Sequence, residues 1–146
     1  MIAVVRVKGG FKTKHKFNDT LRKLRLNKKH HCVILPDNPA NNGMIKKVRH
    51  MITWGEIDKD TLKKLITKRG RQPGNKKIKL TNKKLDSMIK TLMSGKKTLA
   101  DYDIKPVFRL SPPKKGWDKG TVKLEYPRGA LGPRGKDINK LLKKMI

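Results

Sequence analysis

Apolar positions in the first 57 residues form short continuous runs that alternate with helically spaced sets. The run at residues 2–7 is rich in β-branched side chains and ends before two glycines, so it predicts a strand. Residues 17–24 carry apolar side chains at i, i+4 and i+7, which predicts an amphipathic helix. The run at residues 32–35 stops at a proline and predicts a buried strand. A helix beginning at Asn38-Pro39 and a strand at residues 52–54 complete the series.

The pattern after residue 57 is less regular. Helical spacing predicts one helix over residues 58–68 and another from Thr81 to near Gly95. The other predicted elements are a short strand at residues 77–80 within a basic loop, two strands at 107–110 and 122–126 that form a ribbon, and a helix after Asp137. We therefore expect a compact alternating body at residues 1–57, followed by an extension at 58–146 with helices, basic loops and short strands. A length of 146 residues suits one domain with an appendage rather than two full domains.

The charge of the chain narrows the class of partner. Lys and Arg number 39 against 11 Asp and Glu, which gives a net charge of +28. Residues 61–146 contain 25 of these cations and 6 of the acids, so they carry most of the surplus. Such a surplus repels itself and favours a polyanionic partner, either nucleic acid or an anionic membrane surface. The membrane alternative ranks last, because no apolar run approaches the ~20 residues of a membrane span and no basic amphipathic helix carries aromatic anchors.

The expected location is the cytoplasm. The first apolar run ends at Arg6, far short of a secretory signal, and the single cysteine, Cys32, permits no internal disulfide. An enzyme is not expected either. Residues 94–98 lack the glycine that a phosphate-binding loop requires, since that position is Lys90. The four histidines and the scattered acids form no metal-ligating or nucleophilic pattern. The sequence thus predicts no catalytic residue, metal, cofactor or small-molecule substrate.

Two segments have the composition of an RNA-binding loop, and each has an alternative interpretation. Residues 129–135 contain three glycines spaced by three, with arginines and a lysine around them, so amides and guanidinium groups could converge on phosphate. A flexible, solvated linker has the same composition. Residues 112–117 combine prolines, lysines and Trp117, which could stack on an unpaired base or pack against its own domain.

Several motifs together resemble a known family. Residues 31–36 read HCVILP, residues 43–48 read GMIKKV, and residues 54–57 read WGEI. Further matches are RLSPP at residues 109–113 and LGPRG at residues 131–135. These motifs resemble the large-subunit ribosomal protein family called L thirty in archaea and L seven in eukaryotes. The similarity spans nearly the whole chain, and the length suits the archaeal form.

The resemblance implies an α+β fold with a small antiparallel three-stranded sheet that has helices on one face, similar to the ferredoxin-like class, plus the archaeal and eukaryotic extension. Strand polarity comes from the resemblance alone, because a strand-helix-strand unit is ordinarily parallel. The resemblance also implies a structural, non-enzymatic role in the large ribosomal subunit, in contact with large-subunit ribosomal RNA and other ribosomal proteins. The RNA-facing loop of the family corresponds to Lys8 through Lys16.

We therefore expect the chain to bind folded ribosomal RNA by neutralising phosphates with its basic loops. A general DNA-binding or chromatin protein is the main alternative, since charge alone permits it, and an RNA-processing enzyme is a weaker one. The candidate RNA-binding residues are Lys8, Gly9, Gly10, Lys12, Lys14, His15, Lys16, Arg71, Lys76, Lys77, Arg109, Lys114, Lys115, Trp117, Arg128, Arg134 and Lys136.

Overall fold

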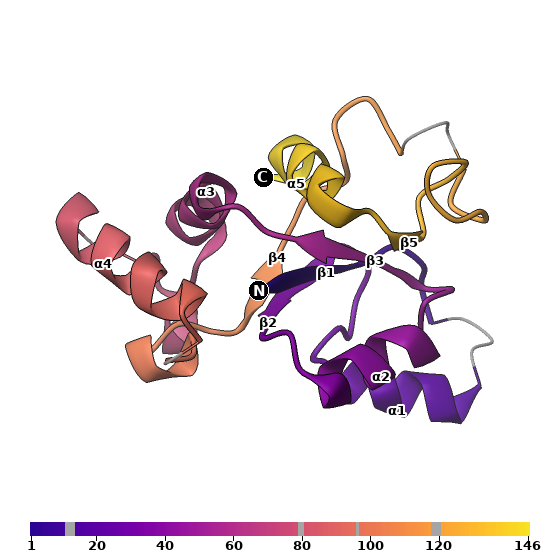
Figure 1. Cartoon of the computed structure of the whole chain (residues 1–146), viewed down its shortest axis with the longest axis horizontal. Helices are drawn as coiled ribbons and strands as arrows, with labels where there is room; N and C mark the ends of the chain where they lie inside the picture. The colour runs from indigo at the N-terminus through magenta and orange to yellow at the C-terminus, as the bar shows by residue number, and fades with distance from the viewer. Residues whose placement is uncertain (11–13, 79–80, 96, 118–120) are drawn as a thin grey trace.

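A computed structural model describes residues 1–10, 14–78, 81–95, 97–117 and 121–146. The chain forms a five-stranded sheet in the order β4-β2-β1-β3-β5, with helices on both of its faces (Figure 1). The strands are β1 Ile2–Arg6, β2 His31–Leu35, β3 Ile52–Glu56, β4 Val107–Arg109 and β5 Gly132–Pro133. The α-helices are α1 His15–Lys23, α2 Pro39–Lys47, α3 Lys59–Arg69, α4 Asn82–Met93 and α5 Ile138–Met145.

The three N-terminal strands form the antiparallel centre of the sheet. Strand β1 lies between β2 and β3, and Val4 faces Val33 on one side and Trp54 on the other. The α+β class is therefore confirmed, and so are the predicted strand and helix positions in the first 57 residues to within a few residues.

Both sides of β1 are buried, which explains its continuous apolar run. Ile2 and Val4 belong to one core cluster, which packs under α1 and α2 through residues such as Leu21 and Ile45. Ala3 and Val5 belong to the other cluster, which α3, α4 and α5 cover. Every residue of β1 is buried for this reason, including the side chain of Arg6.

The prediction of a three-stranded sheet with helices on one face was wrong. Strand β4 extends the sheet as an antiparallel neighbour of β2, and β5 extends it as a parallel neighbour of β3. The extension also supplies α3 and α5, which cover the second face, and α4, which packs against α3 and adds apolar side chains to the same core cluster. The physical reason is that β1 and β2 expose apolar side chains on both faces, so a three-stranded body covered on one side would leave half of them in water. The division of the chain at residue 57 stays a prediction.

The predicted ribbon between residues 107–110 and 122–126 was also wrong. Strand β4 pairs with β2, whereas residues 122–126 form bends that end in a single bridge from Glu125 to Leu131. Leu124 is 52% exposed, so the alternation of apolar and polar residues there does not face a core. Main-chain bonds close this segment on itself, from Leu131 N–H to the Leu124 oxygen and from Gly129 N–H to the Glu125 oxygen. In the predicted strand at 77–80, Lys77 makes one bridge to Arg71, and residues 79–80 lie outside the described residues.

Candidate nucleic-acid interface

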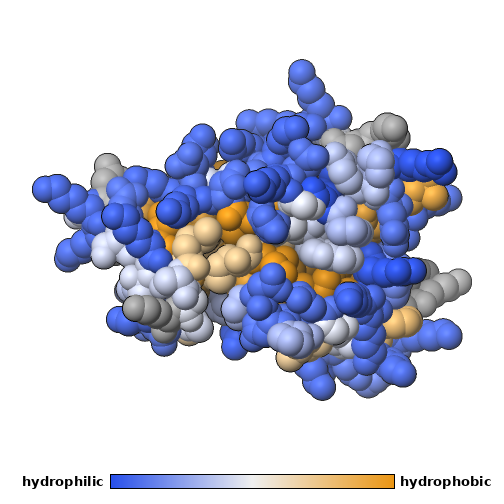
Figure 2. Space-filling model, in the orientation of Figure 1, coloured by the Kyte–Doolittle hydropathy of each residue, from blue (hydrophilic) through white to orange (hydrophobic). Residues whose placement is uncertain are grey.

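Cations dominate the surface of the molecule. Figure 2 shows one face covered mostly by hydrophilic residues, with a narrow hydrophobic band between the α4 end and the end that carries α1 and α2. The ion pairs include Lys63 with Asp86 at 2.6 Å and Lys140 with Asp137 at 2.8 Å. Even if all 11 acids were paired with one cation each, a charge of +28 would remain to be neutralised by solvent ions or by a partner.

The strand register collects four chain segments at one end of the sheet, which we call the basic end. The end of β1, the start of β2, the start of β3 and the end of β4 all lie there. Segments 7–10, 26–30, 49–51 and 110–117 therefore adjoin one another, and they include Lys8, Lys29, Lys114 and Lys115. Contacts confirm this neighbourhood, since the His30 N–H donates to the Arg6 oxygen at 2.8 Å and the Lys8 N–H donates to the Met51 oxygen at 3.1 Å.

A pocket of about 390 Å³ lies beside the β2–β4 edge, and we call it the arginine pocket. Five cationic side chains line it, together with an imidazole, two amides and one valine, and no carboxylate does. The lining residues are Arg25, Asn27, His31, Arg69, Arg71, Asn75, Lys105, Val107 and Arg109. Four guanidinium groups that share one pocket without an acid make a site for an anion.

Segments far apart in the sequence build this pocket. His31 at the start of β2 faces Arg109 at the end of β4, which sets two lining residues side by side. The Lys105 N–H donates to the Arg71 oxygen at 2.8 Å, which joins the segment after α3 to the segment before β4. The turn that leads to Asn75 includes Gly74 in a left-handed conformation, with a φ of 77°.

The arginines of the pocket are held to different degrees. Nη2 of Arg69 donates to Ser111 Oγ at 2.6 Å and to the main-chain oxygen of Ile146 at 3.0 Å. Nη1 of Arg71 donates to the Gly70 oxygen at 2.8 Å. Within the described ranges, the side chains of Arg25 and Arg109 make no hydrogen bond or ion pair. Two guanidinium groups are thus fixed by the protein itself, and two others have their donors available.

His31 contributes a neutral imidazole to the pocket. Burial lowers its pKa below the ordinary 6.5, and the charge of Arg109 acts in the same direction, while a hydrogen bond to the main chain of Arg25 opposes them. The Nδ1 atom of His31 is buried without a hydrogen-bond partner in the part of the chain that the structure describes. A neutral ring avoids adding a further charge beside the arginines.

The loop after β1 is the segment that the family resemblance assigns to RNA. Gly9 is half-buried and Gly10 is exposed, and a Cβ atom at Gly9 would lie 2.9 Å from Cε of Lys29. Lys14, His15 and Lys16 are exposed at the start of α1, where His15 Nδ1 lies 2.9 Å from Asp19 Oδ2. Lys12 lies outside the described residues. Lys8 is half-buried, and the other described cations of this loop stand in solvent next to the basic end.

Trp117 packs against its own domain, which was one of the two interpretations of the sequence. Its ring stacks on His30 with centroids 5.9 Å apart and planes 17° apart, and it contacts the small cluster of Val7, Ala130 and Leu131. Its neighbours Lys114 and Lys115 are exposed, and the Lys114 N–H donates to the Lys144 oxygen at 3.0 Å. The tryptophan therefore fixes a loop that presents two lysines.

Arg134 is buried, with 5% of its surface exposed. Its Nε donates to Thr53 Oγ1 at 3.0 Å, its Nη2 donates to the Ala130 oxygen at 3.2 Å, and its guanidinium lies 4.7 Å from the centre of the Tyr126 ring. Ala130, Leu131 and Gly132 are buried as well. The glycine-rich segment is thus neither a flexible linker nor a loop that offers Arg134 to phosphate, because β5 anchors it to β3.

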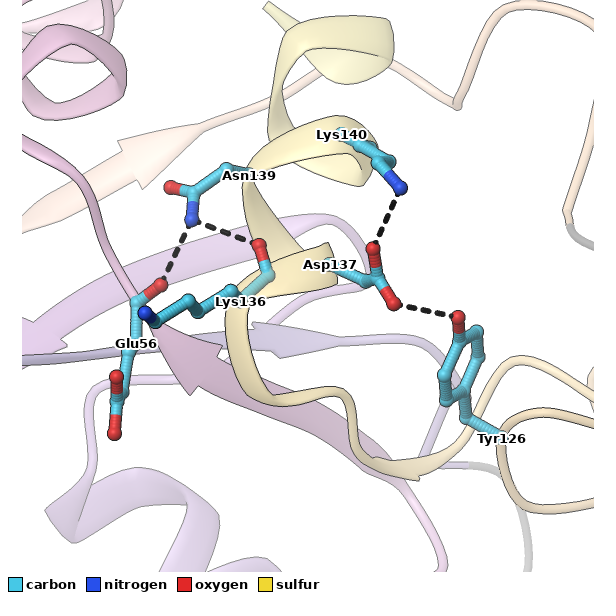
Figure 3. Close-up of polar contacts among 6 residues, drawn as sticks. All are labelled: Glu56, Tyr126, Lys136, Asp137, Asn139 and Lys140. Atoms are coloured by element: carbon cyan, nitrogen blue, oxygen red, sulfur yellow. Dashed lines mark hydrogen bonds and ion pairs between the residues drawn. The ribbon is translucent and has the colours of Figure 1, made fainter.

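The two flanking cations of that segment, Arg128 and Lys136, are exposed. Figure 3 shows how the ends of this region are fixed: Asn139 Nδ2 donates to the main-chain oxygens of Glu56 and Lys136, both at 2.9 Å. The Tyr126 hydroxyl donates to Asp137, whose pKa is lowered mainly by its hydrogen bond from Lys140. These hydrogen bonds fix the main chain that carries Lys136, beside the start of α5.

Sequence reasoning found part of the arginine pocket and missed the rest. Arg71 and Arg109 were candidates and both line it, while the candidates Lys76 and Lys77 are exposed on the adjoining loop. The missed residues are Arg25, Asn27, His31, Arg69, Asn75 and Lys105. The general excess of cations is the only signal in the sequence for the arginines and the lysine among them, and it gives none for the amides and the imidazole, because the pocket depends on the pairing of β4 with β2.

Other kinds of site have no support in the described residues. Within the ranges given above, no group of three His, Cys, Asp or Glu side chains is placed to ligate a metal. A search of the same residues finds no helix that is both long enough and apolar enough to span a membrane. The fold and the pocket together define a strongly basic α+β protein with a cationic pocket at the edge of its sheet.

Known proteins give the particular family. The family model described as Ribosomal protein L30p/L7e matches residues 2–52. The large ribosomal subunit protein uL30 of Methanococcus maripaludis strain C5 is 47% identical over 151 residues, covering 99% of this chain and 98% of that protein. The protein of the same name from Archaeoglobus fulgidus is 42% identical over 153 residues, covering 99% of each. The chain therefore belongs to the ribosomal protein L30p/L7e family.

Family membership confirms the resemblance seen in the sequence. The family consists of structural, non-enzymatic ribosomal proteins, so the prediction that the chain is not an enzyme is confirmed as well. The similar proteins are archaeal and belong to the large ribosomal subunit, which agrees with the predicted cytoplasmic location.

Proposed function

We propose that the chain is a structural constituent of the large ribosomal subunit that binds large-subunit ribosomal RNA through phosphate-neutralising basic loops. The observation that carries this proposal is the gathering of exposed cationic loops at the basic end of the sheet, in a chain with a net charge of +28. The names of the similar proteins, which place them in the large ribosomal subunit, support it. Other ribosomal proteins would be its further partners, and the function needs no cofactor.

The proposed mechanism is electrostatic first and dependent on shape second. Lysines and arginines release condensed counterions when they meet phosphates, which supplies affinity without reading sequence. A-form RNA hides its base edges in a narrow groove, so loops contact backbone, 2′-hydroxyls and unstacked bases instead. Glycines at residues 9 and 10 let this loop fold against the protein, since added Cβ atoms there would meet Lys29 and Arg6. The proposed contacts with Lys8, Lys14 and Lys16, with Lys114 and Lys115, and with Arg128 and Lys136 all follow this logic.

A salt titration tests the proposal. The 146-residue chain is bound to a large-subunit ribosomal RNA transcript at several salt concentrations, and the slope of log K against log salt is measured. Each lost phosphate contact should reduce the slope by about 0.7 to 0.9. We expect the variant Lys114→Gln/Lys115→Gln/Arg128→Gln to reduce the magnitude of the slope by the amount that corresponds to about two to three lost phosphate contacts.

The control variant removes the same charge from exposed helix surfaces, Lys64→Gln/Lys68→Gln/Lys90→Gln, and should change the slope much less. A competing duplex DNA of equal phosphate concentration addresses the main alternative. Preference for the ribosomal transcript supports the proposal, whereas equal binding of DNA and transcript would favour a general DNA-binding role. Equal slopes for the two variants would show that the loops are not the contact surface.

A further inference from the structure

We propose that the arginine pocket is a built binding site for a short segment of RNA backbone, with two phosphates against its guanidinium groups and a ribose between them. The proposal rests on the proposed function and assigns one specific contact within it. It differs from the general attraction of the surface, since a pocket with fixed donors binds a defined group in a defined geometry.

The cations that line the pocket favour the binding of an anion, because they are clustered in one cavity. Five cations line one cavity of about 390 Å³, and no Asp or Glu side chain lines it, although one of the five, Arg69, donates to the oxygen of the last residue, Ile146. Like charges that converge in a cavity are mutually destabilising, and their field is focused by its low-dielectric walls. An anion in the pocket turns this repulsion into attraction. Planar guanidinium groups suit phosphate in particular, because each can donate two parallel hydrogen bonds.

Two of the guanidinium groups are oriented before any ligand arrives. Arg69 is tied to Ser111 and to the main chain of Ile146, and Arg71 is tied to the oxygen of Gly70. These bonds leave other N–H groups of each arginine to donate to a ligand, since a guanidinium has five. Ordering a free arginine costs conformational entropy on binding, so arginines that are already ordered bind more tightly.

Arg25 enters the pocket from the end of α1, at a backbone position that favours glycine. It follows the last turn of α1 with a φ of 58°, the left-handed conformation that a helix end normally assigns to glycine. The surrounding bonds complete that end, from Arg25 N–H to the Arg22 oxygen and from Leu26 N–H to the Leu21 oxygen, both at 2.8 Å. A non-glycine residue is strained there. The residue at this position is nevertheless an arginine, and its side chain lines the pocket.

The remaining lining residues favour RNA over a simple ion or an acidic peptide. The pocket falls in the range of about 300–1,000 Å³ that holds small organic ligands, so it is larger than one phosphate requires. Asn27 and Asn75 bring amides that can both donate and accept, which suits a 2′-hydroxyl. Val107 is the single aliphatic side chain of the lining, enough for the face of a sugar but not for the apolar anchors of a peptide.

The experiment compares two double variants of the full chain at equal charge. Arg71→Gln/Arg109→Gln removes two guanidinium groups from the pocket, and Arg22→Gln/Lys23→Gln removes two exposed cations from α1. We expect the pocket variant to bind the large-subunit ribosomal RNA transcript at least 10-fold more weakly than the α1 variant at the same salt concentration. Equal affinities of the two variants would overturn the proposal.

The variant Arg25→Gly serves as a control for misfolding. Glycine suits the left-handed position, so this variant should have an unchanged or higher thermal midpoint. It should still weaken RNA binding several-fold, and unchanged binding would count against the pocket. Inorganic pyrophosphate and an acidic peptide are added as competitors at matched ionic strength. Displacement of the RNA by the peptide but not by pyrophosphate would overturn the RNA assignment, and failure of the wild-type chain to prefer the transcript over duplex DNA would instead defeat the proposed function.

Discussion

Arg134 and Thr53 lie 81 residues apart in the chain, and the Arg134 Nε donates to the Thr53 hydroxyl oxygen at 3.0 Å. Thr53 in turn donates to the Gly132 oxygen at 2.8 Å, so the pair joins β3 to β5 inside the protein. Both side chains are buried. This arginine therefore serves the fold, although the surrounding sequence has the composition of a phosphate-binding loop.

The first prediction separates this structural arginine from its exposed neighbour. Arg134→Met keeps the aliphatic stem but removes the buried hydrogen bonds, and it should lower the free energy of unfolding by about 1–3 kcal/mol. Urea unfolding measures this loss. At conditions where the variant is folded, its salt slope for ribosomal RNA should match that of the wild type.

The matched variant is Lys136→Met, two residues further on and exposed. It should leave the stability nearly unchanged and flatten the salt slope by one contact. The interpretation of Arg134 fails if its variant is as stable as the wild type and loses the slope instead.

The second prediction concerns the close approach of β3 to the segment before α5. A Cβ atom at Gly55 would overlap the carbonyl oxygen of Gly135 and lie 2.9 Å from Cβ of Ile138. Gly55→Ala should therefore destabilise the chain by about 1–3 kcal/mol, the usual cost of overpacking. Thermal or urea unfolding measures the change.

Gly43 in α2 provides the control, because a Cβ atom there meets nothing within 4 Å. Gly43→Ala should stabilise the chain by about 0.5–1 kcal/mol, since alanine suits a helix interior better than glycine does. A stable Gly55→Ala variant would mean that the contact between β3 and residues 135–138 is looser than the structure shows.

The sequence predicted the local elements well because their signals are local. Hydrophobic period and end residues located β1, α1 and β2, and Thr81 marks the start of α4 as expected. The sheet order could not be predicted in this way, since β4 has only three residues and pairs with a distant strand: His31 faces Arg109, which lies 78 positions later in the chain. Strand pairing at such distance depends on tertiary packing rather than on propensity.

The candidate site shows the same limit at the level of side chains. Counting cations identified the class of ligand, and glycine-rich basic segments were reasonable candidates for its contacts. The sequence could not distinguish Arg134, which the core contains, from Arg128, which faces solvent. The left-handed backbone of Arg25 and its place in the pocket likewise appear only in three dimensions.

The third prediction follows from histidines whose pKa values lie below the ordinary 6.5. Burial is the main cause for His30, His31 and His50, and neighbouring cations lower the pKa of each further. As the pH falls below about 6.5, the unfolded chain takes up these protons first. The free energy of unfolding therefore has its full value above about pH 6.5 and decreases as the pH falls toward the pKa values of the folded state.

Urea midpoints measured between pH 7.5 and pH 5 should thus decrease, in a range where the carboxylates remain ionised. The variant His31→Gln should show a smaller decrease than the wild type, because one of the three groups no longer titrates. A midpoint that is constant or rises across this range would contradict the assignment of neutral, partly buried imidazoles.

The fourth prediction uses Cys32, the single cysteine of the chain, as a probe of the shared core. Its thiol is fully buried in the core cluster to which α3, α4 and α5 contribute, and burial raises its pKa. In the full-length protein, alkylation by iodoacetamide at neutral pH should therefore be slow and limited by unfolding, because only an exposed thiolate reacts.

A fragment of residues 1–57 tests whether the predicted body folds without the extension. Removing residues 58–146 exposes Ala3, Val5, Cys32 and Ile34, which belong to the core cluster shared with those helices. A three-stranded sheet with one apolar face in water buries too little surface to be stable, so the fragment should aggregate or remain unfolded. Circular dichroism and the alkylation rate of Cys32 measure this. A fragment that is monomeric and cooperatively folded, with only its thiol now reactive, would show that the body is an independent unit and that the extension merely covers it.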